Sequence, residues 1–415
     1  MDANEIREHD ISLRAGSRVG VAGDHRVIDL LDGDFYVNDP YTTYGWMREN
    51  APVYWDPINE LWGISRYDDI IEIEKNKHVF INSDTDKGGY RPNIPADQAI
   101  IGLDDPEHHQ RRSLVSRRFT PRGVSKWEDH VRDVSNELID TAIGHGGPIE
   151  VVNEIAAPLA AEMIGLLMGF PEEMWPKLMA WSEETIALGG GPRYLLEDRI
   201  IAAMEFAQAS ADLYEEKKKC PADDVMSLWT AAEVPGCKFG VEEVISDSLL
   251  LLDGGAETTR TVIARTLLNL AAHPEQWDLL RGGADLTVAV EEFIRYVTPI
   301  HNMCRVATED TAVAGQTIRA GDQVVLMYSS ANRDPKYFDR PEELDVTRHP
   351  NNHISFGFGT HFCLGASLAR LEIRVMFEEL LRRVRGFRVV EGSVDEMPNS
   401  FVYGLRSARV EFDLL

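Results

Sequence analysis

The sequence predicts a single, mainly helical domain with a small β part, and three observations support this. Apolar residues recur at intervals of three and four from residue 106 to about residue 280. One uninterrupted helical pattern, from 241 to 272, is long enough to cross the interior of a domain. Strand-like alternation is confined to short regions, and no linker-like change of composition divides the chain. We therefore expect one domain over residues 1–415, with about 1–29 as an N-terminal extension.

The expected elements follow in chain order. Segments 51–55 and 61–65 predict a hairpin, and 106–280 predicts a series of helices. Within that series the 241–272 helix would be about 48 Å long, and its four consecutive leucines indicate that it passes through the core. Short strands are expected between 311 and 327, with turns at Gly315 and Gly321. A long loop over 332–352 and a last helix from Cys363 to about Arg385 complete the prediction.

The composition is that of a folded protein that stays in solution, with 44% hydrophobic and 27% charged residues. Formal net charge is 42 − 69 = −27, which argues against a nucleic-acid binder because phosphate contacts need clustered cations. The four cysteines are far apart, as is typical of a reducing compartment. The N-terminus lacks a signal-peptide pattern, and the apolar stretch 155–170 is too short to span a bilayer. We expect a cytoplasmic protein with no membrane anchor and no nucleic-acid partner.

The most informative segment is a glycine-rich loop around one cysteine, Phe356-Gly357-Phe358-Gly359-Thr360-His361-Phe362-Cys363-Leu364-Gly365. Its glycines let the backbone turn tightly and approach a flat object without interference from Cβ atoms. The helix expected after Cys363 would point N–H groups and its positive dipole end at the sulfur, which favours thiolate over thiol. A thiolate held in this way suits a soft metal ion, and haem iron is the prominent ion held by a single cysteine.

This loop resembles the haem-binding loop of the cytochrome P450 superfamily, whose pattern is Phe-x-x-Gly-x-His/Arg-x-Cys-x-Gly. All five fixed positions are met, by Phe356, Gly359, His361, Cys363 and Gly365. The resemblance implies that Cys363 is the axial ligand of a haem iron. It implies further haem contacts from Phe356, Gly357, His361 and Gly365. The implied fold is a helical prism with short β-sheets, in which the haem lies between the long central helix and the helix after the cysteine.

Two alternatives stay open for the cysteine loop. His349, His353, His361 and Cys363 could form a zinc site, although their spacing matches no common zinc finger. A lone cysteine can also be an inert buried residue, which would leave the surrounding glycines unexplained.

The long helix contains Gly254-Gly255-Ala256-Glu257-Thr258-Thr259 in its middle. Each glycine in a helix interior costs about 1 kcal/mol relative to alanine, and a carboxylate in an apolar stretch adds a desolvation cost. Such a segment indicates function, because glycine lets a cofactor or substrate press against the backbone. A threonine hydroxyl can also bind the carbonyl one turn back and open a bulge. The alternative is a plain contact between helices through small residues.

The same segment resembles the oxygen-activation motif of the cytochrome P450 family, Ala/Gly-Gly-x-Asp/Glu-Thr-Thr/Ser. This resemblance implies that Thr258 orients water on the oxygen-binding side of the haem and that Glu257 relays protons from solvent. It also implies that Gly254 and Ala256 lie against the haem. Cleavage of the oxygen–oxygen bond consumes two protons, so the chemistry needs a proton path that excludes bulk water.

Haem propionates need cationic or N–H donors, and three positions resemble those of the family. Asp105-Pro106 predicts a helix start, which places His108 and Arg112 on one face of that helix. This pair resembles the family's His-x-x-x-Arg clamp, and Arg305 resembles its strand arginine. His361 would be a further donor. Taken singly, each could be an ordinary surface charge.

Glu292 and Arg295 match the family's Glu-x-x-Arg pair. The pattern is weak alone, because Glu257/Arg260 and Glu379/Arg382 match it too, and only the position upstream of the cysteine loop selects Glu292. The resemblance implies a buried structural ion pair, completed by Arg348, that braces the cysteine loop.

Together these resemblances imply a haem-thiolate monooxygenase that inserts one atom of O2 into a C–H bond and reduces the other to water. The implied cofactor is haem b, with electrons from NAD(P)H through a separate reductase and a ferredoxin. Basic residues in 111–126 and 370–385 predict a docking surface for an acidic redox protein. A peroxide-driven peroxygenase and a non-catalytic haem protein remain alternatives, and we expect a monomer.

The substrate pocket is expected to be apolar and to contain no charged anchor, which predicts a lipophilic substrate. Its expected wall consists of Leu250, Ala256, Ile300, Met303, Phe401 and Val402. Asn302-Met303-Cys304-Arg305 and Asn351-Asn352-His353 resemble actinobacterial oxidases of cholesterol and cholest-4-en-3-one side chains. This resemblance implies hydroxylation of a sterol side chain. A terpenoid, fatty acid or polyketide substrate is the alternative.

Overall fold

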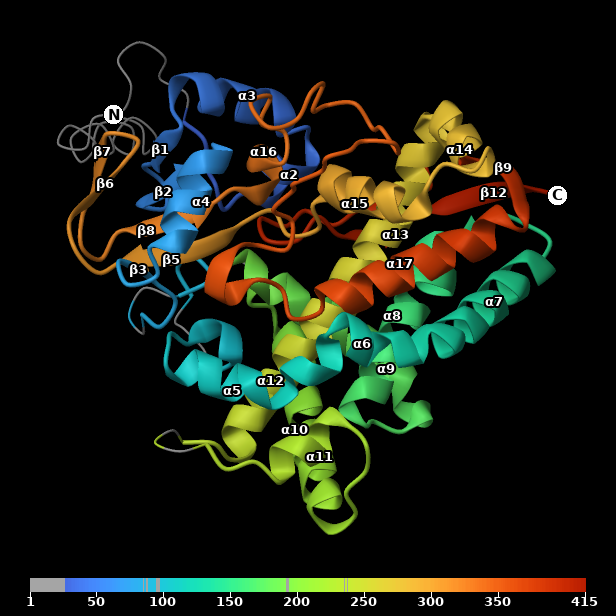
Figure 1. Cartoon of the computed structure of the whole chain (residues 1–415), viewed down its shortest axis with the longest axis horizontal. Helices are drawn as coiled ribbons and strands as arrows, with labels where there is room; N and C mark the ends of the chain where they lie inside the picture. Colours follow the sequence, from blue (N-terminus) through green and yellow to red (C-terminus); the bar gives the residue numbers. More distant parts are fainter. Residues whose placement is uncertain are drawn as a thin grey trace.

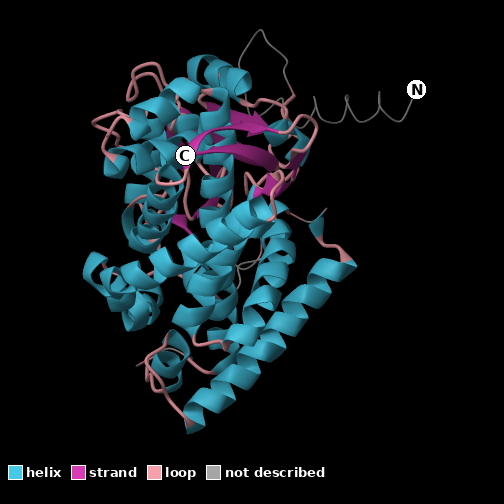
Figure 2. Ribbon diagram, turned by 90° about the vertical axis from the view of Figure 1, so that its right-hand side faces the viewer, coloured by secondary structure: helices cyan, strands magenta, loops and turns pink. Residues whose placement is uncertain are grey.

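The structure is a computed structural model that describes residues 27–84, 86, 89–94, 98–191, 194–234, 236 and 238–415. Most of the predicted N-terminal extension (1–29), together with Cys237, lies outside the described residues. Helices make up most of the molecule (Figures 1 and 2), and the strands lie in two places, at the left of Figure 1 and at its right beside the C-terminus. The predicted fold class, mainly α with a small β part, is confirmed.

The helices differ widely in length, from single turns to 23 residues. They are α2 (Gly33–Val37), α3 (Tyr41–Asn50), α4 (Tyr67–Lys75), α5 (Glu107–Ser116), α6 (Pro121–Val124), α7 (Glu128–Gly144), α8 (Ala157–Met168), α9 (Trp175–Ala187), α10 (Glu197–Lys219), α11 (Val225–Thr230), α12 (Val241–Leu252), α13 (Thr258–Ala272), α14 (Pro274–Arg281), α15 (Leu286–Val297), α16 (Tyr328–Ala331) and α17 (Ala366–Leu381).

The strands form small sheets. They are β1 (Val53–Asp56), β2 (Leu61–Ile64), β3 (Phe80–Ile81), β4 (Ile149–Glu150), β5 (Met303–Ala307), β6 (Thr311–Val313), β7 (Gln316–Ile318), β8 (Gln323–Leu326), β9 (Val384–Val389), β10 (Asp395–Glu396), β11 (Leu405–Ser407) and β12 (Arg409–Leu414). The largest sheet has the order β1-β2-β8-β5-β3, and a three-stranded sheet has the order β4-β12-β9. In the largest sheet β2 and β8 are parallel, with Gly63 opposite Val325.

The predicted long helix is present as α12 and α13, joined by a π-type turn over Asp253–Glu257. It ends at Ala272, directly before His273-Pro274, because a proline cannot continue the hydrogen-bond ladder. The helix crosses the interior of the molecule behind α17 (Figure 1). The bulge falls on the Gly254-Gly255 pair, the weakest helix formers in the segment.

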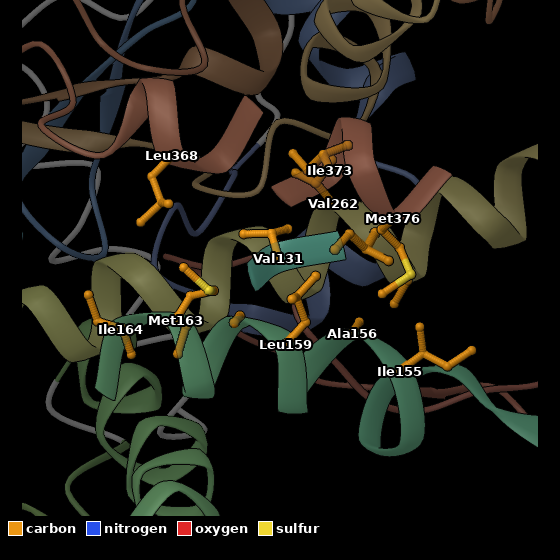
Figure 3. Packing of buried hydrophobic residues seen from close by; sticks show 14 of the residues in the cluster. Val131, Ile155, Ala156, Leu159, Met163, Ile164, Val262, Leu368, Ile373 and Met376 are labelled. Atoms are coloured by element: carbon orange, nitrogen blue, oxygen red, sulfur yellow. The ribbon is translucent and has the colours of Figure 1, made fainter. Parts of the chain in front are cut away.

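The main core lies where α8, α13 and α17 meet. Ile155, Leu159 and Met163 face Val262 of α13 and Met376 of α17 (Figure 3). The segment Val151–Met168 is long and apolar enough to cross a membrane by length and composition, so the expectation that the stretch 155–170 is too short to do so was wrong. It is 72% buried inside the protein, as expected of a core helix.

The local predictions agree with the structure, whereas pairings distant in sequence were missed. The hairpin is β1–β2, with Val53 opposite Ile64, and the region 332–352 is loop except for turns. The last helix ends at Leu381 rather than near Arg385, because β9 begins at Val384. The sheet that joins β9 and β12 to β4 was not predicted.

Candidate active site

A deep cavity lies between the long helix and the cysteine loop. It contains about 1700 Å³ of unoccupied space, its opening to solvent included. Leu250, Gly254 and Thr258 of the long helix form one wall, and the loop around Phe356 and Cys363 lies in another. The remaining wall is largely apolar, with Ile100, Ile101, Ile164, Ile186, Pro299, Ile300, Met303 and Phe401.

The cysteine loop has the tight backbone that its glycines predict. Gly357 and Gly359 both have φ of 70°, in the left-handed region that L side chains rarely adopt. The backbone N–H of Cys363 donates to the carbonyl of Phe356 over 2.9 Å, which closes the loop. Gly365 then precedes the first residue of α17. The loop therefore fixes the sulfur directly before the N-terminus of a helix.

Burial raises the pKa of the Cys363 thiol above its ordinary value. The backbone N–H groups of Gly365 and Ala366 and the charges of Arg112 and Arg370 act in the opposite direction. The helix therefore acts in the predicted direction, but desolvation outweighs it, so the helix by itself does not favour a thiolate over the thiol. A bound metal cation deprotonates a coordinating thiol, so thiolate formation here depends on the ion.

The polar groups of the cavity fit a haem. His108 is 2% exposed, its Nδ1 lies 3.5 Å from Asp105 Oδ1, and its Nε2 is buried without a hydrogen-bond partner among the described residues. Its ring lies 4.3 Å from that of His361, centroid to centroid, and Arg112 and Arg305 line the same cavity. Burial and the positive charges of Arg305, His108 and Arg112 lower the pKa of His361 to about 2. This set of donors can bind an anion such as a haem propionate.

Two of these donors already have partners within the protein. Arg305 forms an ion pair with Glu74 at 2.9 Å, and Tyr328 donates to the same carboxylate over 2.5 Å. Arg112 donates to the carbonyl of Phe362. Arg305 is therefore held in place by a buried carboxylate, and its charge is largely compensated.

The glycines of the long helix leave room for a flat group. A Cβ atom built on Gly254 would meet no atom within 4 Å, and this residue is exposed to the cavity. The Thr258 hydroxyl donates to the Gly254 carbonyl over 2.7 Å, across the π-type turn, as the sequence predicted. Thr258 itself lines the cavity. The open space opposite Cys363 thus has the position that the resemblance implies for a haem.

Glu257 faces away from the cavity. Its carboxylate accepts a hydrogen bond from Ser182 of α9 over 2.9 Å and forms an ion pair with Arg260 at 3.0 Å. Arg260 in turn lies 3.6 Å from Glu183, whose side chain is 34% exposed. Burial raises the pKa of Glu257, and the Arg260 charge opposes this shift. A chain of ionisable groups therefore runs from the surface to the residue beside Thr258.

Two predicted residues lie elsewhere. Ala256 is 3% exposed and packs in the main core, and Val402 is fully buried with Met397 and Phe401, so neither lines the cavity. Helical periodicity explains the first error, because residues 250, 254 and 258 share one face and residue 256 lies nearly opposite. For Val402, the strand pattern does not apply, because the residue lies outside the strands and forms an isolated β-bridge with Ile300. The other predicted wall residues, Leu250, Ile300, Met303 and Phe401, line the cavity.

Glu292 lies at the centre of a buried ion network. Arg295 donates to both of its carboxylate oxygens, over 2.7 and 2.8 Å, and Arg348 donates over 3.1 Å. The Asn351 side chain donates over 3.1 Å. Arg295 also donates to the carbonyl of Asn332, and so connects α15 to the long loop. The predicted pair and its predicted third member are therefore in contact.

Three charged residues of the cavity were missed by sequence reasoning. Asp253, Arg91 and Glu372 all line it, so the expectation of a pocket without charged groups is wrong. Burial raises the pKa of Glu372 well above its ordinary value. A signal for Asp253 was present, since an acid directly after four leucines in a core helix is expensive to bury.

The predicted basic docking surface is mostly neutralised. Arg111 is buried against Asp247 at 2.6 Å, and Arg118 is bound to Asp223 at 2.5 Å. On the second stretch each arginine has an acidic partner: Arg370, Arg374, Arg382, Arg383 and Arg385. Arg117 and Arg122 are exposed and form no ion pair with a described residue. The surface is therefore smaller and less basic than expected.

The zinc alternative is contradicted. His353 is bound to Glu291 at 3.1 Å, and His349 is exposed. Within the described ranges, no group of three or more His, Cys, Asp or Glu residues is arranged to hold a metal ion. Cys363 therefore has no second side-chain ligand of this kind beside it.

Comparison with known proteins agrees with this geometry. The family model for cytochrome P450 matches residues 286–408. A steroid C26-monooxygenase of Mycobacterium tuberculosis is 37% identical over 394 residues, which cover 93% of this chain and 97% of that protein. This chain belongs to the cytochrome P450 family. Cytochromes P450 are monooxygenases that use haem b and O2, with electrons from NAD(P)H through redox partners.

Solved cytochromes P450 share the fold. A Mycobacterium marinum cytochrome P450 in complex with pseudoionone has a TM-score of 0.86 at 31% identity, covering 95% of this chain and all of that chain. A Bacillus megaterium cytochrome P450 in complex with testosterone has a TM-score of 0.82 at 32% identity, covering 90% and 98%. The helical prism and its minor sheets are thus those of the family.

His301, next to the cavity wall, predicts a pH dependence of stability. Its ring lies between those of Tyr36 (4.5 Å) and Tyr403 (5.1 Å), and neither ring nitrogen has a hydrogen-bond partner among the described residues. Burial, with a smaller effect from Arg265, lowers its pKa to about 3. The unfolded chain therefore takes up a proton near pH 6.5 that the folded protein does not bind. The stabilisation that the neutral His301 contributes is fully present above pH 6.5 and is lost as the pH falls toward 3.

The contribution of His301 amounts to about 1.4 kcal/mol per pH unit below pH 6.5. His301→Phe should therefore flatten the pH dependence of urea unfolding between pH 6.5 and 4.5 by about this slope. His145→Phe, at a side chain that is 61% exposed, is the matched control. Equal slopes for His301→Phe and the natural protein would show that His301 is protonated in the folded state.

Proposed function

We propose that this cytochrome P450 hydroxylates the side chain of a sterol, cholesterol or cholest-4-en-3-one. The observation that carries the proposal is the cavity, whose wall beyond the cysteine loop is largely apolar and reaches from Ile100 to Phe401. A rigid lipophilic molecule can be buried there, and about 25 cal/mol per Å² of apolar surface would favour its binding. The name of the M. tuberculosis relative supports the same substrate class.

We further propose how the residues of the site would hold the haem. Cys363 would supply the sulfur that binds the iron, and Phe356, Gly357 and Gly365 would shape the loop around it. His108, Arg112, Arg305 and His361 would bind the propionates, and Gly254 would let one face of the haem approach the helix. When bound, haem b supplies the chemistry that activates O2, with one oxygen atom inserted into substrate and the other reduced to water.

Two residues of the long helix would handle protons. The Thr258 hydroxyl, anchored on the Gly254 carbonyl, would hold water in the cavity beside the reacting oxygen. Glu257 would take protons from the surface beside the partly exposed Glu183, with Arg260 holding the two carboxylates close together, and would pass them inward. The raised pKa of its carboxyl supports this role, because a proton is bound and released closer to neutral pH.

A spectral titration of the purified holoprotein tests the substrate. Cholest-4-en-3-one should convert low-spin to high-spin haem at low micromolar concentration, and hydroxylation at the end of its side chain should follow in a reconstituted assay. Palmitic acid is the comparison ligand. A full spin shift with palmitic acid and none with either sterol would contradict the sterol proposal.

A second candidate substrate class is supported by the M. marinum neighbour, which was solved with pseudoionone. A terpenoid could occupy the part of the cavity between Ile300 and Thr258. The same spectral titration with pseudoionone distinguishes the sterol from the terpenoid class, because the ligand that binds more tightly identifies the substrate class.

We propose a soluble ferredoxin as electron donor, docked near the exposed Arg117 and Arg122. Arg117→Glu combined with Arg122→Glu should slow reduction of the haem by the ferredoxin about tenfold at low salt, with the difference fading in 0.5 M salt. Arg281→Glu, an exposed arginine at the end of α14, is the matched control. Stopped-flow measurements give the rates of haem reduction. If the Arg117→Glu/Arg122→Glu variant is reduced as fast as the natural protein, the proposed docking surface is wrong.

A further inference from the structure

One acidic residue of the cavity has no place in the roles described above. Asp253 begins the π-type turn of the long helix, directly after Leu252, and lines the cavity. It is 5% exposed, so its carboxylate is nearly out of solvent. Leu250 and Leu251 line the same wall. A carboxylate at this point can accept a hydrogen bond from a ligand, which a hydrocarbon cannot donate.

Asp253 is held in position from a second helix. The Thr185 hydroxyl of α9 lies 2.6 Å from Asp253 Oδ1, and Thr185 is 1% exposed. The same hydroxyl lies 2.7 Å from the Trp181 carbonyl, and its single proton can satisfy only one of the two acceptors. A carboxylate has about four acceptor sites, so it can bind a donor in the cavity in addition to its partners in the protein.

The position of Asp253 relates it to the reacting centre. Asp253 and Thr258 are five residues apart across a π-type turn, where i and i+5 are joined, so both lie on the cavity side one turn apart. One helical turn is about 5.4 Å. A substrate group that reaches Asp253 therefore lies close to the carbon that is presented beside Thr258.

The sign of the neighbouring charge selects the kind of group. Arg91 lines the same cavity and lies 5.9 Å from the centre of the Phe401 ring, which is also in the wall. The Asp253 carboxylate disfavours a substrate carboxylate close to it, and the sterols proposed above carry no ammonium group. A neutral donor fits both. A hydroxyl group is the simplest neutral donor on a lipophilic molecule.

We infer that Asp253 is a specificity-determining residue that accepts a hydrogen bond from a substrate hydroxyl near the oxidised carbon. The inference rests on the proposed monooxygenase function and refines its substrate class. We expect the preferred sterol to carry a hydroxyl on its side chain. An unmodified side chain would displace water from the Asp253 carboxylate without donating a hydrogen bond in its place. The alcohol should bind at least about tenfold more tightly than the matching hydrocarbon.

Two ligand pairs test the inference by spectral titration of the holoprotein. They are 26-hydroxycholest-4-en-3-one against cholest-4-en-3-one, and dodecan-1-ol against dodecane. Asp253→Leu should reduce the affinity ratio within each pair from at least about tenfold to about one. Asp253→Asn, which keeps an acceptor oxygen, should retain part of the ratio. Leu250→Val alters the same wall without a charge and should leave the ratio unchanged.

The outcomes separate the inference from the sterol proposal. An unchanged ratio in Asp253→Leu would overturn the role of Asp253, even if sterols bind well. If no sterol binds but dodecan-1-ol is preferred until Asp253 is replaced, the sterol proposal fails and the inference stands. Haem content and the carbon monoxide spectrum show whether each variant is folded, and Asp253→Asn decides the question if Asp253→Leu does not hold haem.

Discussion

Glu292→Gln is expected to destabilise the protein by about 3–5 kcal/mol. The substitution keeps the shape of the side chain but removes the negative charge between Arg295 and Arg348, which are 0% and 8% exposed at the side chain. Two buried guanidinium groups would then lack their counter-charge. Urea unfolding of the purified holoprotein measures the change in stability. Loss of haem should accompany unfolding, because Arg348 and Asn332 connect this network to the chain before the cysteine loop.

A surface ion pair provides the control for Glu292. Glu343 pairs with Arg340 at 2.7 Å, and their side chains are 59% and 60% exposed. Glu343→Gln should change stability by less than about 1 kcal/mol, because solvent screens an exposed pair. An equally small loss for Glu292→Gln would mean that the buried network does not brace the fold.

Glu257→Gln should lower the rate of product formation by about a hundredfold or more, because a glutamine cannot bind and release protons. Thr258→Ala should act differently. It removes the hydroxyl bound to the Gly254 carbonyl, so oxygen is still consumed but is reduced without substrate oxidation. The measurement is product formed per O2 consumed, together with the solvent deuterium isotope effect on turnover. The isotope effect should increase for Glu257→Gln.

Glu183→Gln is the matched control for Glu257, since Glu183 is 34% exposed and lies 3.6 Å from Arg260. Its substitution should slow turnover far less, because water can replace a partly exposed carboxylate in a proton path. If Glu257→Gln turns over at the natural rate, protons reach the cavity by another path.

Sequence reasoning succeeded where a short segment carries its own chemistry. The loop around Cys363 and the segment Gly254–Thr259 combine residue types at a spacing that is rare outside one kind of site, and both lie on the cavity. Local patterns also predicted the β1–β2 hairpin and the extent of the long helix, because hydrophobic periodicity depends on neighbours within a few residues.

Properties that depend on distant partners could not be predicted in this way. The arginines of α17 form a basic run in the sequence, yet Glu291 and Glu128, which are distant in the chain, neutralise Arg370 and Arg374 in the fold. Desolvation at Cys363 exceeds the effect of its helix, and the degree of desolvation depends on segments that only the fold brings together. The sheet of β4, β9 and β12 joins segments more than 200 residues apart, beyond the reach of local pattern.

The sulfur of Cys363 as the ligand of haem iron is the central claim, and carbon monoxide tests it most directly. Carbon monoxide added to the dithionite-reduced holoprotein should give the red-shifted Soret band of a haem with a trans thiolate. Cys363→Ala should lose that band, through loss of either the haem or the thiolate. A colourless holoprotein preparation, or the same band in Cys363→Ala, would contradict the assignment.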